Sequence, residues 1–182
     1  MNTPTERGGG GHHSRGYDES LGEFLSRHRN HRYRMTVNWL GNLGPGTSTY
    51  SAYSRDHQLS APDKATTISG SADPAFHGDG GRYNPEELLL GALSSCHMLW
   101  VLHLSANAGI VVTEYSDEAT GEMVQHPDGS GEFTLAVLRP RMVIADASRI
   151  AEAIALHDRA HSLCFVARSV AFPVKCEPTV TA

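Results

Sequence analysis

The chain has 182 residues, 40% of them apolar, which is enough for one domain with a hydrophobic core. A formal net charge of −5 disfavours nucleic acid or an anionic membrane as a partner, because both select concentrated basic surfaces. The N-terminal sequence MNTPTERGGGGHHSRG lacks the apolar segment of a secretory signal, and we find no run of about 18 apolar residues to span a bilayer. We therefore expect a cytoplasmic protein with no membrane or nucleic-acid partner.

Residues 1–30 have the composition of a flexible arm. A run of four glycines stands among scattered charged and polar residues, and this gives little apolar surface to offset the entropy of ordering. Leu21, Phe24 and Leu25 at helical spacing favour at most a short docked helix. Residues 31–182 are expected to form a single domain.

The first part of this domain is predicted to form strands and turns. Tyr33, Met35, Val37 and Trp39 alternate with polar residues, which predicts a half-buried strand. The sequence GNLGPG predicts a turn, residues 47–56 favour β-structure through their Thr and Tyr content, and residues 71–82 favour a loop.

A long helix is predicted to begin after Asn84. Asn84 is a good N-cap, Pro85 fits the first helical position, and Glu86 with Glu87 faces the positive end of the helix dipole. The helix should run to about Ala108 and end at Gly109. Its interior is apolar on nearly every side, which indicates a helix surrounded by protein.

The rest of the chain predicts more strands and a second helix. Residues 110–145 favour an antiparallel meander with a hairpin at HPDGSG, and a helix is expected to start near Ala147 or Ser148. One face of that helix would carry Ile150, Ala153, Ile154, His157, Ala160, His161 and Cys164. A strand at 169–176 follows, at a sheet edge because of Pro173. We predict an α+β fold with antiparallel sheets wrapped around two central helices.

The three cysteines are the main candidates for chemistry. Cys96 lies in the long helix and Cys164 at the end of the second, and two antiparallel helices at 8–10 Å could bring their thiols into disulfide range. Both could equally be packed core thiols. A reactive thiol also needs a cation supplied by the fold, because the helix dipole fades within the first turn. Cys176, in the last predicted strand, has no such thiol partner, and we interpret it as structural or incidental.

The segment NPEELLLGALSSC at 84–96 resembles the hallmark of the OsmC/Ohr family of organic hydroperoxide reductases, in which Asn-Pro-Glu precedes the peroxidatic cysteine. WLGNLGPGTST at 39–49 and AHSLC at 160–164 follow the family order, so that the resemblance covers roughly residues 33–178. It implies a thiol peroxidase in which Cys96 attacks the peroxide, Cys164 resolves the product as a disulfide, and Glu86 holds a catalytic arginine. It also implies an intertwined homodimer, no bound cofactor or metal, and an external dithiol reductant such as a lipoyl group.

The catalytic arginine is the residue that the pattern leaves open. The early turn contains no arginine, and Arg55 in YSRDH is our first candidate, with Arg82 as the second. The resolving segment also differs, because Phe165 follows Cys164 where the family often has proline. Apolar residues expected near Cys96, namely Leu93, Leu99, Trp100 and Phe76, favour an organic hydroperoxide as substrate.

Two other functions stay open. His157, His161 and Cys164 share one helix face, and His97 and His103 lie on the other helix, so that a zinc site is the main alternative. The histidines could equally be hydrogen-bonded residues at the edge of the core. The third possibility is a non-catalytic protein of the same fold that binds an apolar ligand between its helices.

Overall fold

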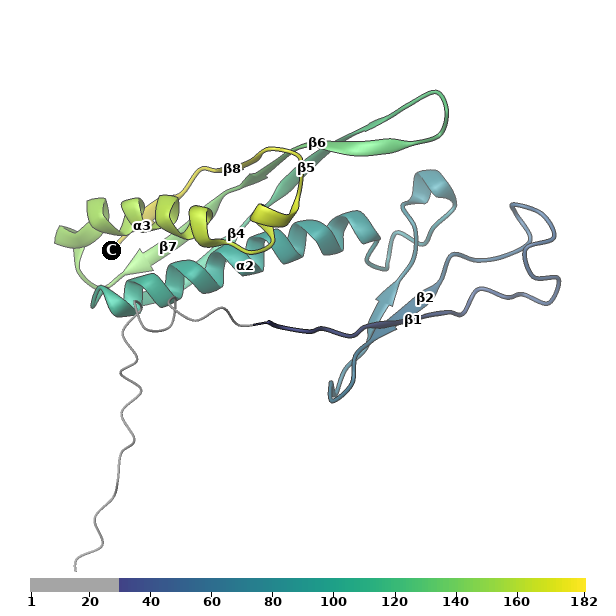
Figure 1. Ribbon diagram of the computed structural model, residues 1–182, viewed down its shortest axis with the longest axis horizontal. Coiled ribbons are helices and arrows are strands. Elements are labelled where there is room, and N and C mark those ends of the chain that lie inside the picture. Colours follow the sequence, from purple (N-terminus) through teal and green to yellow (C-terminus); the bar gives the residue numbers. More distant parts are fainter. Residues whose placement is uncertain (1–29) are drawn as a thin grey trace, which may run out of the picture. The chain divides into compact units, whose positions relative to one another are not determined.

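The structure is a computed structural model that describes residues 30–182 (Figure 1). The chain divides into two units, Met1–Arg32 and Tyr33–Ala182, and the description below concerns the second. The short helix predicted at Leu21, Phe24 and Leu25, like most of the predicted N-terminal arm, lies outside the described residues.

The unit begins with a small antiparallel sheet. Strands β1 (Thr36–Trp39), β2 (His57–Ser60) and β3 (Ile68–Gly70) pair in the order β1-β2-β3. These strands pack chiefly on one another. The strand predicted at 33–39 is present only at Thr36–Trp39, and its apolar side is not half-buried: Val37 is 61% exposed, and Met35, just before the strand, 55%.

Residues 47–56 form turns and coil, so the β-structure favoured there is wrong. The guanidinium of Arg55 donates hydrogen bonds to the carbonyl oxygens of Tyr53 and Tyr50, at 2.6 and 2.7 Å. These bonds fold the segment back on itself and compete with an extended strand. A 3-10 helix, η1 (Pro74–Phe76), follows β3, and the side chain of Asp73 caps it.

Two three-stranded sheets form the rest of the β-structure. One has the order β4 (Val112–Asp117), β7 (Pro140–Ile144), β9 (Thr179–Thr181), and the other the order β5 (Thr120–Gln125), β6 (Gly131–Leu138), β8 (Val174–Cys176). The β5–β6 hairpin at HPDGSG is confirmed, and β8 lies at an edge as predicted. However, β8 covers only the last three residues of the strand predicted at 169–176. The simple meander is wrong, because β4 pairs with β7 and the last two strands pair in parallel with β6 and β7.

Helix α2 (Pro85–Asn107) begins and ends where the sequence predicts. The side chain of Asn84 accepts a hydrogen bond from the Glu87 backbone at 2.7 Å, and the Glu87 carboxylate accepts one from the Asn84 backbone at 3.1 Å. This reciprocal capping box fixes the first turn. At the other end Gly109 adopts a left-handed conformation, with φ of 69°, which stops the helix.

By length and composition α2 could cross a membrane, so the expectation that no segment could do so is wrong. Its two acids lie in the first turn, and the rest of the helix carries no Asp, Glu, Lys or Arg. The core helix of a globular domain has the same composition, and α2 packs against both α3 and β4.

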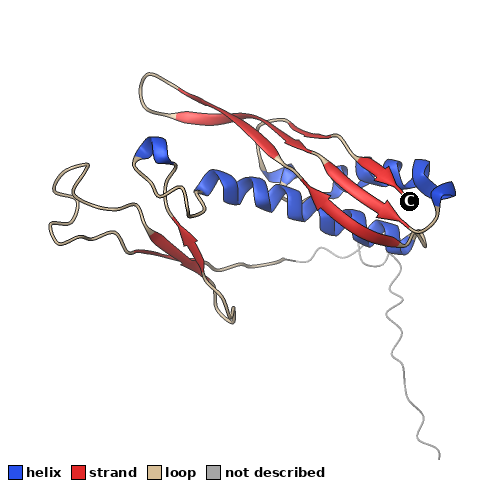
Figure 2. Ribbon diagram, turned by 180° about the vertical axis from the view of Figure 1, so that it is seen from behind, coloured by secondary structure: helices blue, strands red, loops and turns tan. Residues whose placement is uncertain are grey.

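The second long helix, α3 (Ile150–Leu163), follows a short 3-10 turn, η2 (Ala147–Arg149), and another 3-10 turn, η3 (Ala167–Ser169), precedes β8. Four residues of its predicted inner face are buried: Ala153, His157, Ala160 and Cys164. Figure 2 shows the strands of the two later sheets along one side of the α2–α3 pair. The core between these layers contains Leu93, Val101, Ala136, Leu138, Met142 and Ile144. The α+β class predicted from the sequence is confirmed.

Candidate functional site

The packing of α2 against α3 brings two cysteines together. Cys96 lies near the middle of α2, and Cys164 is the residue that ends α3. The two side chains lie close enough for the Cys96 thiol to raise the pKa of Cys164, although 68 positions separate them in the chain (164 − 96). The juxtaposition expected from two antiparallel helices is therefore present. All three cysteines are in the thiol form.

The two thiols differ in environment. Cys164 is 1% exposed, whereas Cys96 is only partly buried. Burial, followed by the hydrogen bond and charge of Cys96, raises the pKa of the Cys164 thiol to about 11, against a smaller lowering effect of the Ala167 backbone N–H. Cys164 is thus protonated at neutral pH, and a small molecule reaches Cys96 first.

Apolar and aromatic groups surround this pair. Leu93 and Trp100, one turn away from Cys96 on either side, are buried, and the Trp100 ring meets the Phe165 ring edge to face at 5.6 Å between centroids. Phe165 directly follows Cys164 and is 62% exposed, as is Leu99. Phe76, which we expected here, lies elsewhere, in a pocket beside Glu86.

Arg55 and Glu86 form a second group of candidate residues. They line one pocket of about 360 Å³, together with Trp39, Tyr53 and Phe76. The Arg55 guanidinium carbon lies 4.3 Å from the ring centroids of both Tyr50 and Tyr53, in cation–π geometry. Glu86 precedes Cys96 by ten residues, or about 15 Å of helix. Cys96 does not line this pocket. In the described part of one chain, the four predicted site residues therefore form two separate pairs, Cys96 with Cys164 and Arg55 with Glu86.

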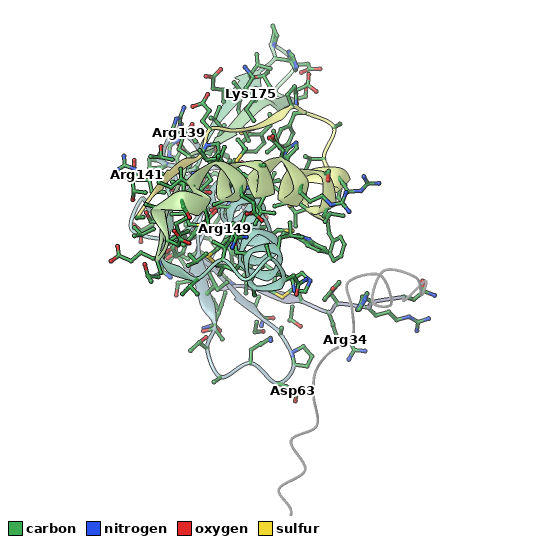
Figure 3. The ribbon with its side chains drawn as sticks, turned by 90° about the vertical axis from the view of Figure 1, so that its left-hand side faces the viewer. Arg34, Asp63, Arg139, Arg141, Arg149 and Lys175 are labelled. Carbon is green, nitrogen blue, oxygen red and sulfur yellow. The ribbon has the colours of Figure 1, made fainter. Side chains whose placement is uncertain are left out.

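Other arginines are already paired with carboxylates. Arg82, the second candidate, contacts Asp79 at 3.1 Å and Asp56 at 3.6 Å. Three arginines labelled in Figure 3 are likewise paired: Arg139 with Glu177, Arg141 with Glu118 and Arg149 with Glu152. Arg55 is bound by carbonyl oxygens and aromatic faces instead, and no ion pair to it is found among the described residues.

A buried polar cluster lies beside the thiol pair. His97 Nε2 is 3.0 Å from His157 Nδ1 and 3.4 Å from the Cys176 sulfur. Cys176 therefore contacts a histidine, a neighbour that the sequence did not predict. The sequence missed this cluster because 79 positions separate His97 from Cys176 and the strand pairing that joins them is non-local.

Burial governs the titration of all three groups. It lowers the pKa of His97 and of His157 to about 4, with the charges of His157 and His161 adding to the effect on His97. Burial, with the negative charges of Asp117, Asp158 and Glu177, raises the pKa of Cys176 to about 12. Two neutral imidazoles and a thiol thus face one another at pH 7.

The histidine set proposed from the sequence divides differently. His157 contacts His97 and groups with Cys176. His161 and Cys164, which were predicted on the same helix face as His157, are not part of this group. His103 contacts the Asn107 amide at 3.2 Å and the Trp100 ring. The metal-compatible groups of the described residues are therefore on three elements, α2, α3 and β8.

Two helices packed against two small mixed sheets, with one cysteine of each helix beside the other, define a class of small α+β proteins built around a cysteine pair. The model of the OsmC-like protein family matches residues 78–179. The chain belongs to the OsmC-like family, and the resemblance inferred from the sequence is confirmed.

Relatives agree with this assignment. An OsmC-like protein of unknown function from Vibrio cholerae has a TM-score of 0.73 and 31% identity, over 82% of this chain and 100% of that one. An organic hydroperoxide resistance protein OsmC from Legionella pneumophila has a TM-score of 0.60 and 18% identity, over 84% and 100% of the two chains. The protein YmaD of Bacillus subtilis is 26% identical over 144 residues, which are 77% of this chain and 87% of that one. The family thus includes hydroperoxide-resistance proteins.

Proposed function

We propose that the protein is a thiol peroxidase that reduces organic hydroperoxides, with Cys96 as the attacking cysteine and Cys164 as the resolving one. The observation that carries the proposal is the contact between the Cys96 and Cys164 thiols, from two different helices. A disulfide needs its two sulfurs adjacent, and this pair meets that condition without a large rearrangement of α2 or α3.

The difference in burial supports the assignment of roles. A peroxide must reach the attacking sulfur, and Cys96 is the more exposed of the two. Cys164, buried and held protonated by its raised pKa, is a poor first nucleophile. It sits, however, at contact distance from the sulfur that becomes oxidised.

The reaction balances without a cofactor. The Cys96 thiolate attacks the peroxide O–O bond, which leaves a sulfenic acid on Cys96 and releases an alcohol after protonation. The Cys164 thiol then displaces water from the sulfenic acid and forms the disulfide. An external dithiol, such as a lipoyl group, reduces the disulfide and is itself oxidised, which returns both thiols.

The Arg55–Glu86 pocket supplies the remaining polar groups. Glu86 orients the arginine, and the guanidinium stabilises negative charge on the thiolate and on the departing oxygen. Within one chain Cys96 does not line this pocket. The proposal therefore includes a homodimer, in which the loop and strand segments that hold Arg55 either rearrange or contact a second copy of the chain. The exposed apolar side chains of β1 and of α2 provide the surface that such a dimer would cover.

Mass analysis after addition of one equivalent of cumene hydroperoxide tests the mechanism. The wild type should form a Cys96–Cys164 disulfide and consume the peroxide. Cys164→Ser should instead carry a sulfenic acid on Cys96 that proceeds to sulfinic acid with more peroxide. Ser95→Ala, a change next to Cys96 on an exposed side of α2, is the control and should behave as the wild type.

Two results would overturn the proposal. A disulfide that contains Cys176 in place of Cys164 would show that the resolving role is misassigned. Peroxide that remains unconsumed by fully reduced wild-type protein would favour a non-catalytic member of the family.

A further inference from the structure

Two buried histidines, His97 and His157, and the partly buried Cys176 form a cluster where α2, α3 and β8 meet, and the peroxidase mechanism does not use it. The exposed fractions of His97 and His157 are 0% and 1%. One nitrogen from each ring and the Cys176 sulfur all lie within 4.8 Å of one another. Polar atoms from three separate elements therefore converge on one point in the interior.

Hydrogen bonding alone does not satisfy this cluster. His97 Nε2 is the contact atom for both partners, His157 Nδ1 at 3.0 Å and the Cys176 sulfur at 3.4 Å. A neutral ring nitrogen offers either one proton or one lone pair, directed along a single line in the ring plane. His97 Nε2 can therefore form one well-directed hydrogen bond, and its contact with the other partner cannot be a good hydrogen bond.

The outer ring nitrogens add to the problem. His97 Nδ1 and His157 Nε2 are buried and have no hydrogen-bond partner among the described residues. If the two inner nitrogens share a proton, one outer nitrogen must carry an N–H and the other a lone pair, both unpaired. Each such buried group costs about 1–3 kcal/mol. With zinc on the two inner nitrogens, both outer nitrogens carry an N–H, and each needs a water or protein acceptor. Support for the metal therefore comes from the inner nitrogens and the sulfur.

The separations match those between ligands of a tetrahedral zinc ion. With Zn–N distances of about 2.0–2.1 Å and a Zn–S distance of about 2.3 Å, tetrahedral ligands lie about 3.3 Å apart for N–N and about 3.5 Å for N–S. The observed N–N and N–S distances of 3.0 and 3.4 Å need only a small opening of the cluster. Imidazole and thiolate are also the ligands that zinc prefers over oxygen donors.

We propose that His97 Nε2, His157 Nδ1 and the sulfur of Cys176 bind one Zn²⁺ ion. Binding forms two Zn–N bonds and one Zn–S bond, and the thiol proton of Cys176 is released to solvent. The fourth tetrahedral position remains for a water molecule. The ion joins α2, α3 and β8, so its role is structural, next to the thiol pair and without a part in peroxide chemistry.

Tyr115 and Asp117 provide polar groups on the strand side of the site. The Tyr115 hydroxyl is buried and has no hydrogen-bond partner among residues 30–182. Burial raises its pKa, and the nearby charges of Asp117 and then Cys176 add to this effect. A hydroxyl at this position can donate a hydrogen bond to a metal-bound thiolate or water.

Metal analysis and Co²⁺ substitution of the full-length protein test the site. Metal-free, fully reduced wild type should take up one equivalent of Zn²⁺, release about one proton, and show thiolate-to-cobalt charge-transfer absorption with Co²⁺. Cys176→Ser and His157→Gln should each weaken Zn²⁺ binding by more than about 100-fold, since even outer-shell changes cost 10–100-fold. Cys176→Ser should also abolish the charge-transfer band.

Two control variants make the test specific. Cys96→Ser removes the cysteine next to His97 and the proposed peroxidase activity, and it should keep the metal and the charge-transfer band. His161→Asn alters the other histidine of the same face of α3 and should also keep the metal. Success or failure of the zinc site is therefore independent of the proposed peroxidase function.

Thermal unfolding distinguishes variants that lose zinc binding from variants that fail to fold. Zn²⁺ should raise the melting temperature of the wild type, Cys96→Ser and His161→Asn, because it binds only the folded state, and should leave that of folded Cys176→Ser unchanged. The proposal is overturned if the wild type takes up no stoichiometric Zn²⁺ at micromolar concentration. It is equally overturned if Cys176→Ser binds as tightly as the wild type, or if His161→Asn loses the metal.

Discussion

The thiol of Cys96 lies beside the thiol of Cys164, which is almost fully buried at the end of α3. This contact raises the pKa of Cys164 in addition to the larger effect of burial. In this arrangement the inner thiol keeps its proton while the outer one is available to react. The order of the two proposed chemical steps follows from this difference.

The alkylation rate of Cys164 should report its raised pKa. Because the pKa is about 11, the thiolate fraction should rise about tenfold per pH unit between about pH 8 and pH 10, with no plateau. Cys96→Ala removes a hydrogen bond and a charge that both raise this pKa, so the alkylation curve should move to lower pH. It should stay above the value of an exposed thiol, since burial is the largest cause. Peptide mapping after iodoacetamide treatment measures each cysteine separately, and an unmoved curve in Cys96→Ala would contradict the contact.

Replacement of Arg55 should slow peroxide reduction. Arg55→Met removes a guanidinium that would stabilise developing negative charge, a contribution of about 100-fold in rate. Arg55→Lys should also be slow, because a lysine cannot donate to the Tyr50 and Tyr53 carbonyls in the same fork geometry. Arg82→Met is the control: Arg82 is already paired with Asp79, and its loss should change the rate little. Single-turnover kinetics with cumene hydroperoxide measure all three, and the reverse ranking would make Arg82 the catalytic cation.

The aromatic side chain after Cys164 should affect substrate preference. Phe165 is 62% exposed and packs edge to face against the buried Trp100 ring, so that it can contact the apolar part of a bound organic peroxide. Phe165→Ala should raise the KM for cumene hydroperoxide several-fold and leave kcat/KM for hydrogen peroxide nearly unchanged. Leu99→Ala provides a second test on the facing helix. Equal effects on both peroxides would remove the argument for an organic substrate.

The start of α2 should be sensitive to the loss of its cap. Asn84→Ala removes the acceptor for the Glu87 backbone N–H and should lower the free energy of unfolding by about 1 kcal/mol. Asn84→Asp keeps an acceptor in the same position and should retain most of the stability. Urea unfolding monitored by circular dichroism gives both values. A loss for Asn84→Asp as large as that for Asn84→Ala would mean that the cap acts by another route.

The sequence predicted the helices well because their signals are local. The cap at Asn84, the stop at Gly109 and the three-and-four spacing of the α3 face all operate within a few residues, and the structure has each of them. The adjacency of Cys96 and Cys164 followed from placing both helices, with the family resemblance adding their roles.

Contacts between segments far apart in the chain could not be predicted from the sequence. The parallel pairing of β8 with β6 brings Cys176 to His97, and no pattern in either segment indicates that pairing. Residues 47–56 have β-forming composition, yet the hydrogen bonds of one side chain, Arg55, hold them in turns. The alternation at Tyr33–Trp39 was correct for a strand, but the surface that would bury its apolar side is absent from the described part of one chain.

That exposed strand leads to the prediction on assembly. Val37 and Met35, 61% and 55% exposed, lie in and just before β1, whose sheet packs chiefly on its own strands. Contiguous exposed apolar surface of this kind is typical of an interface, and on α2 Leu99 is 62% exposed as well. We expect light scattering at micromolar concentration to give the mass of a dimer. Val37→Asp should shift the protein toward monomer, because a carboxylate buried at an interface without a partner is strongly unfavourable.

Val111→Asp is the matched control for this prediction. Val111 is 63% exposed, and it lies just before β4, away from the β1 sheet in sequence. The same substitution there should leave the dimer intact, and in an isolated chain either change should alter the free energy of unfolding by no more than about 0.5 kcal/mol. A wild-type protein that is monomeric at micromolar concentration would refute the dimer. Dissociation by Val111→Asp but not by Val37→Asp would place the interface near β4 and not at β1.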